Sequence, residues 1–185
     1  MFVKVPDRSR PRALPSTRTL LICAALAALQ TLIYAFVAPM TPVLAVVMPP
    51  LYALVAGVHS FMPFLARLLT RTPWTATITA VVTGVLVWPF SAIGPLVIVT
   101  FLVGSAAFDL ALLRSGQPSW HRLILAACIA GAALFVISLP VFSPQHLTVA
   151  ILTGTILGRM LGEIGAVIFA TVLVRALRAA GIQGS

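Results

Sequence analysis

Acidic residues are almost absent from this sequence. Only three of its 185 residues are Asp or Glu, and charged residues of both signs make up 8%. A soluble domain of this size needs far more polar surface, so the composition excludes an ordinary soluble fold. The sequence also has no metalloprotease, nucleophile-elbow or nucleotide-binding motif. We therefore do not expect an enzyme, and any active transport would take its energy from ATP hydrolysed by another chain.

Cysteine and histidine are equally scarce, with two and three residues respectively. Cys23 and Cys128 lie far apart within apolar runs, so they do not indicate a disulfide framework. The cysteines and histidines also lack the spacing of a structural zinc site. We expect no metal ion and no cofactor bound to this chain.

Long apolar runs are what the sequence has instead, since 61% of its residues are hydrophobic. They predict an all-α membrane protein, a bundle of six transmembrane helices. The predicted passages are 19–38, 43–69, 74–89, 93–113, 123–139 and 147–177. The first run resembles a signal peptide, but it is about 20 residues long and can span a bilayer, so we interpret it as an uncleaved helix. Prolines 49, 50 and 63 interrupt the second run, which is either one kinked passage or two short segments.

The basic residues predict the orientation of the bundle. The net charge is +9, and eleven of the twelve Lys and Arg residues fall in the loops on one side. Those loops are 1–18, 67–74, 114–122 and 175–185, and the opposite loops are 38–42, 89–92 and 140–146. The positive-inside rule then places both termini in the cytoplasm and the protein in the plasma membrane, with no need for nucleic acid as a partner. The predicted organisation is a disordered basic tail (1–18), a membrane domain (19–178) and a second cytoplasmic tail (179–185).

The last predicted helix contains the most unusual pattern. Arg159 and Glu163 lie four residues apart in an apolar stretch, where charges are costly. They either neutralise each other as a structural pair or face a polar cavity and bind a solute. Beside them is a row of glycines at four-residue spacing, which predicts close helix packing, within the bundle or against a partner protein. These glycines are Gly154, Gly158 and Gly162.

Few other polar residues lie in the apolar runs. Gln30 and Tyr34 share one face of the first helix, and His59 lies in the interrupted second passage, where a hydrogen-bonded core position is the simpler interpretation. Asp109 lies near the cytoplasmic end of its helix, where Arg114 is a candidate partner. The threonines of the third run can bond back to their own helix. Trp88 and Phe90 are either membrane-interface anchors or aromatic contacts for a solute.

Several stretches together resemble the S components of energy-coupling factor (ECF) vitamin transporters. "PLYALVAGVHSFMPFLARLLTRTPWTA" (50–76), "VLVWPFSAIGPL" (85–96) and "FLVGSAAFDLALLR" (101–114) are similar to the thiamine-precursor type, and Ala24 and Ala28 form a small-xxx-small pair like the family's alanine motif. The resemblance implies six helices and solute binding in the outer half of the bundle, beneath a lid at 38–42. It also implies a transmembrane coupling subunit, contacted through the two alanines, and two ATPase subunits.

The resemblance makes the outer-facing Tyr34, Trp88, Phe90 and His146 candidate pocket residues, with Gln30 and Arg159 deeper. Glu163 joins the candidate set as the charged partner of Arg159. A different hypothesis is a membrane subunit without transport activity, which docks into a larger complex through the glycine row.

Overall fold

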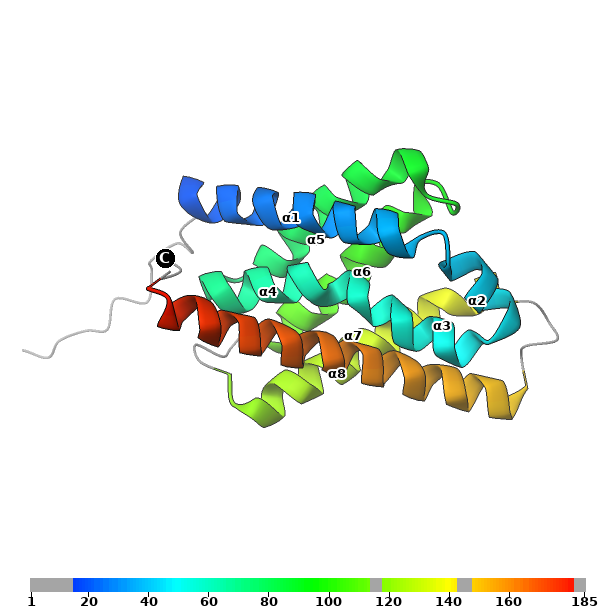
Figure 1. Cartoon of the computed structure of the whole chain (residues 1–185). Helices are drawn as coiled ribbons and strands as arrows, with labels where there is room; N and C mark the ends of the chain where they lie inside the picture. Colours follow the sequence, from blue (N-terminus) through cyan, green and yellow to red (C-terminus); the bar gives the residue numbers. More distant parts are fainter. Residues whose placement is uncertain (1–14, 114–117, 143–147, 182–185) are drawn as a thin grey trace, which may run out of the picture.

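The computed structural model describes residues 15–113, 118–142 and 148–181. In these ranges the chain forms only helices, joined by short connections (Figure 1). They are α1 (Thr17–Val37), α2 (Thr41–Val47), α3 (Pro49–Ala56), η1 (Gly57–Ser60), α4 (Phe61–Thr70), α5 (Thr75–Val87), η2 (Trp88–Phe90), α6 (Leu96–Ala111), α7 (Trp120–Ser138), η3 (Leu139–Val141) and α8 (Val149–Ala179). The prediction of an all-α protein is thus confirmed for the described residues.

Four helical segments in these ranges are long and apolar enough to cross a membrane. They are α1, the α3–η1–α4 segment (Pro49–Thr70), α7 and α8. α6 and the α5–η2 segment (Thr75–Phe90) are apolar but shorter. The 16 residues of α6 cover about 24 Å at 1.5 Å per residue, slightly less than a hydrocarbon core of about 30 Å. The predicted count of six passages requires both shorter segments to cross as well.

The interrupted second passage forms the centre of the bundle. In the α3–η1–α4 segment, 67% of the most apolar window is buried, against 17–33% in the other three long segments. α3 packs on α8, and α4 contacts α1, α5 and α8. Figure 1 shows this segment, in cyan, running between α1 and α8. The start of α1 and the end of α8 lie at the same end of the bundle, as an even number of passages requires.

Proline explains where the second passage is interrupted. Pro49 and Pro50 begin α3, where the missing N–H groups have no helical partner to lose. Pro63 lies in the first turn of α4 and cannot donate to the carbonyl of His59. The preceding four residues accordingly form the 3₁₀ segment η1. The structure therefore favours one irregular passage, preceded by the separate helix α2.

The connection between α1 and α3 is longer than the predicted lid. Residues 38–42 are only its beginning, because α2 already starts at Thr41 within them and has no buried residue. α2 packs against α3 at the end of the bundle where α1 finishes. Any lid formed by this connection therefore includes α2.

The glycine row of α8 packs against α3. A Cβ added to Gly158 would lie 2.4 Å from the carbonyl oxygen of Pro50, and one added to Gly162 would lie 2.5 Å from that of Leu54. Gly154 faces the Pro50 ring, and Gly57, the first residue of η1, meets the backbone of Gly162. The row is thus occupied by a helix of the same chain.

Gly158→Ala is expected to destabilise the protein by about 1–3 kcal/mol, because its methyl group would push against α3 backbone rather than a flexible side chain. Gly165→Ala is the matched control, since nothing lies within 4 Å of a Cβ added there. Thermal unfolding in detergent should show a clear drop for the first variant and no drop for the second. Equal midpoints for the two variants would contradict this packing.

Candidate functional site

Arg159 and Glu163 of α8 point into the protein. Their side chains are 11% and 0% exposed, and Arg159 Nε lies 3.3 Å from Glu163 Oε1. Gly131 of α7 makes room for the acid, because a Cβ there would lie 3.4 Å from Glu163 Cγ. Burial of one carboxylate and one guanidinium inside an apolar bundle is costly even when the two are paired. The pair therefore lies where polar contacts beyond the pair would be favourable.

Several polar atoms around this pair have no hydrogen-bond partner of good geometry among the described residues. They are both carboxylate oxygens of Glu163, the Nε of Arg159 and the Nδ1 of His59. Ser60, which follows His59 in η1, lies close to the Glu163 carboxylate, and the Arg159 charge acts on the His59 ring. An unsatisfied buried polar group costs about 1–3 kcal/mol, more when it is charged. Arg159 Nε and Glu163 Oε1 contact each other as an ion pair, so Glu163 Oε2 and His59 Nδ1 are the atoms left for a ligand.

Aromatic rings line the side of this cluster toward α1 and α6. The ring centroids of Tyr34 and His59 are 5.1 Å apart, and that of Phe101 lies 6.2 Å and 6.0 Å from theirs. The Tyr34 hydroxyl donates a hydrogen bond to Ser91 Oγ at 3.2 Å, which fixes the ring toward the end of the bundle that holds η2. The three rings could contact a flat solute from one side while the charged pair contacts its edge.

Gln30 holds the irregular segment η1 in place. Its Nε2 donates to the carbonyl of Val58 at 3.4 Å, and its Oε1 accepts from the backbone N–H of Met62 at 3.1 Å. The Val58 carbonyl also accepts from the Phe61 N–H, so the amide of Gln30 links two backbone groups where the α-helical pattern breaks. The fully buried Gln30 therefore positions His59 and Ser60.

We name His59, Ser60, Arg159 and Glu163, with the rings of Tyr34 and Phe101, the central polar cluster. Its members come from α1, η1, α6 and α8. The sequence singled out Tyr34 and the charged pair, but it favoured a core role for His59 and gave no signal for Phe101 or Ser60. The useful signal was the combination of proline and glycine around His59, because irregular backbone at membrane depth often lines a site. No group of three His, Cys, Asp or Glu residues suited to a metal ion occurs in the described part of the chain.

The remaining predicted site residues lie elsewhere. Trp88 and Phe90 are 49% and 62% exposed on η2, which favours their interpretation as interface anchors. His146 lies outside the described residues. Ala24 and Ala28 are exposed on α1, facing away from the bundle. They are available to a neighbouring helix.

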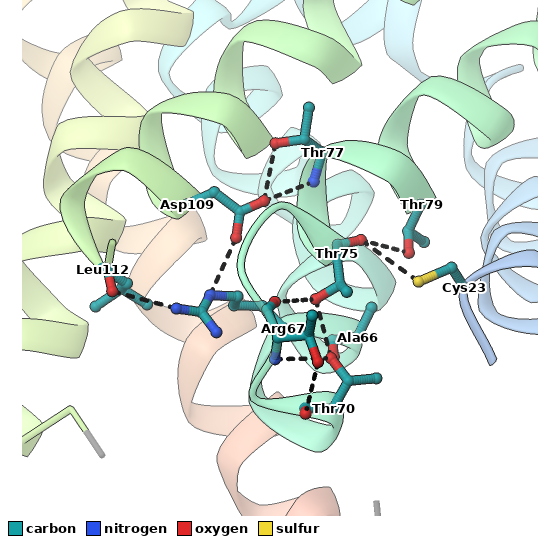
Figure 2. Close-up of polar contacts among 10 residues, drawn as sticks. Cys23, Ala66, Arg67, Thr70, Thr75, Thr77, Thr79, Asp109 and Leu112 are labelled. Atoms are coloured by element: carbon teal, nitrogen blue, oxygen red, sulfur yellow. Dashed lines mark hydrogen bonds and ion pairs between the residues drawn. The ribbon is translucent and has the colours of Figure 1, made fainter. Parts of the chain in front are cut away.

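A second buried polar network lies toward the end of the bundle where α8 finishes. Figure 2 shows its contacts. Asp109 pairs with Arg67 of α4 (Oδ1–Nε 3.1 Å) and accepts two hydrogen bonds from Thr77, one from its backbone N–H and one from its hydroxyl. Arg67 also donates to the carbonyl of Leu112 at 3.2 Å. The sequence suggested Arg114 as a partner of Asp109. Arg114 lies outside the described residues, and within them the charged partner of Asp109 is Arg67 of α4.

Hydroxyls around this network bond to their own helix, as the sequence predicted. Thr79 and Thr83 each donate to the carbonyl four residues earlier, at 2.8 Å. Thr75 instead donates to the carbonyl of Thr72. These bonds leave the threonines with a structural role, so the network stabilises the bundle and is distinct from the central polar cluster.

Asp109→Ala should destabilise the protein by about 3–5 kcal/mol, because it leaves the nearly buried Arg67 without its anion. The double variant Arg67→Met with Asp109→Leu removes both charges and should recover most of the loss. The measurement is the unfolding midpoint of purified protein in detergent. A single variant as stable as the wild type would contradict this structural role.

Comparison with known proteins supports the fold. No protein-family model matches the sequence, and no curated protein matches it significantly. The structure is similar to a solved one described as "Crystal structure of an S-component of ECF transporter", with a TM-score of 0.80 and 19% sequence identity. The match covers 90% of this chain and 87% of that one. At this level of identity the likeness shows that the two chains share a fold, and the predicted resemblance is confirmed to that extent.

Proposed function

We propose that this chain is the solute-binding S component of an ECF-type importer. The observation that supports the proposal most directly is the central polar cluster, whose buried carboxylate and imidazole each have an atom without a partner among the described residues, inside a bundle with the fold of an S component. In this proposal the solute enters from the outside, near the end of the bundle that holds α2 and η2. The chain captures the solute, and partner subunits supply the energy.

The chemistry of the cluster favours a small, flat, nitrogen-rich solute. A buried carboxylate accepts hydrogen bonds from an amino group or a protonated ring nitrogen, and a guanidinium donates to a ring nitrogen or hydroxyl. The rings of Tyr34, His59 and Phe101 offer apolar faces to an aromatic ring. An aminopyrimidine of the kind found in thiamine and its precursor meets all three requirements, and it agrees with the type that the sequence resembles.

The proposed topology follows from the charges and the fold together. The end of the bundle where α1 begins and α8 finishes also holds Arg67, Arg71, Arg175 and Arg178. We place this end in the cytoplasm of a multi-pass plasma-membrane protein, with α5 and α6 as the two short passages. The exposed Ala24 and Ala28 would contact the transmembrane coupling subunit, and two ATPases would complete the transporter.

The alternative of a docking subunit without a ligand loses its main support. It required the glycine row of α8 as a free surface, and that row is occupied by α3. A subunit that binds no solute would also leave the polar atoms of Glu163 and His59 without a ligand to contact.

A direct binding experiment tests the proposal. Protein purified in detergent is titrated in a calorimeter with thiamine, with its aminopyrimidine precursor, and with riboflavin and biotin as solutes of different shape. We expect one site per chain and preference for the aminopyrimidine compounds. Binding of riboflavin or biotin instead would overturn the solute class alone, whereas absence of binding to a broad vitamin panel would count against the function.

A further inference from the structure

An open cavity of about 270 Å³ lies at the proposed cytoplasmic end of the bundle, between α4, α7 and α8. Four arginines line it, two from the end of α4 and two from the end of α8, together with Trp120 and Thr171. The four are Arg67, Arg71, Arg175 and Arg178. It is separate from the central polar cluster, with which it shares no residue.

The charges at this cavity are not balanced by carboxylates among the described residues. The whole sequence has three acidic residues, Asp7, Asp109 and Glu163. Asp109 is committed to Arg67, and Glu163 to Arg159. In the ranges 15–113, 118–142 and 148–181 no carboxylate is left for the other three arginines, and Arg71 and Arg178 are close enough to repel each other. An anion in this cavity would relieve that repulsion.

A second hollow of about 160 Å³ adjoins the first and has a different character. Trp120, Thr171 and Arg175 line both, while Ile168 and Val172 complete the second one. These two aliphatic side chains are 41% and 58% exposed on α8, a helix long and apolar enough to face lipid. The arginine-lined cavity thus continues into an apolar groove on the surface of the bundle.

We propose that the two hollows together bind an anionic phospholipid. The guanidinium groups of Arg71, Arg175 and Arg178 hold its phosphate, since the planar fork of arginine matches phosphate oxygens. An acyl chain lies along the groove at Ile168 and Val172. Trp120, exposed by 42%, lies at the headgroup level, where amphipathic rings are favoured. A free phosphate ion would fit between these arginines, but it would leave the adjoining apolar groove unoccupied.

Delipidated protein and native mass spectrometry test this site. Phosphatidylglycerol and phosphatidylcholine of the same chain length are added in turn, and the bound fraction of each is measured. We expect phosphatidylglycerol to bind at least tenfold more tightly. Arg175→Gln should remove most of that preference, and the control Arg18→Gln, which removes one charge at the same end but outside the cavity, should keep it. Equal binding of the two lipids, or equal effects of the two variants, would overturn the proposal.

Two further arms distinguish a lipid from a free ion. Val172→Trp fills the groove and removes no positive charge, so it should weaken phosphatidylglycerol binding several-fold. Inorganic phosphate should compete with the lipid only at concentrations far above it. If the tryptophan variant binds the lipid normally and inorganic phosphate displaces it readily, the cavity binds phosphate alone and the lipid assignment is wrong. Circular dichroism of each variant confirms that it is folded.

Discussion

Glu163→Gln is expected to weaken solute binding by about 10–100-fold while the protein remains folded. The substitution keeps the shape of the side chain, but it replaces a buried charged acceptor with a neutral amide. A hydrogen bond to a charged group contributes about 1.5–3 kcal/mol, which corresponds to this range of affinity. The measurement is calorimetric titration of the purified variant with the solute that the wild-type protein binds.

Thr155→Val is the matched control for this experiment. Thr155 lies on the same face of α8, is 1% exposed, and donates its hydroxyl hydrogen bond to the carbonyl of Ile151 in its own helix. Its loss should change affinity less than threefold, because that hydroxyl already has a partner. If Glu163→Gln lowers only the unfolding temperature and binds solute as the wild type does, Arg159 and Glu163 are a structural pair and the central polar cluster is not the site.

Ala28→Trp is expected to abolish uptake while leaving solute affinity within about twofold of the wild type. Ala28 is exposed on α1 and contributes to no buried cluster, so a large side chain there can point away from the bundle. It would, however, prevent another helix from approaching closely, which small residues permit. Uptake and copurification with the coupling subunit should be measured in cells that express all subunits.

Ala150→Trp is the corresponding control. It introduces the same side chain at another exposed alanine, near the start of α8 rather than on α1. It should leave both uptake and assembly near wild-type levels. Normal uptake by Ala28→Trp would exclude this face of α1 as the coupling contact, without bearing on solute binding.

The sequence predicted the helices well because each apolar run has one dominant physical requirement. A run such as α1 or α7 must bury its backbone polar groups internally, and a helix does so whatever its neighbours are. The second run was harder, because the backbone around Pro63 depends on contacts from other helices. Gln30, 32 residues before Met62, bonds to the Met62 N–H and the Val58 carbonyl there, and a contact between distant residues leaves no local pattern.

In the candidate site, too, contacts within one helix were predictable and contacts between distant segments were not. Arg159 and Glu163 were predictable as a pair because they share one helix face. The sequence could not show that His59, Ser60 and Phe101 would join them, since these residues come from two other segments of the chain. For the same reason the sequence gave no signal that Asp109 would pair with Arg67 of α4. Trp88 and Phe90 are aromatic, like many residues that line solute pockets. Only the structure shows that they are exposed on η2.

The central claim is that the buried polar cluster holds a small solute, and native mass spectrometry of freshly purified protein tests it most directly. The wild-type chain, expressed in medium rich in vitamins and their precursors, should carry one small molecule per chain, with the mass of a nitrogen heterocycle. Glu163→Gln should carry much less, and Thr155→Val should carry as much as the wild type. A wild-type chain that is folded and assembles with its coupling subunit, yet carries no small molecule under any of these conditions, would contradict the account.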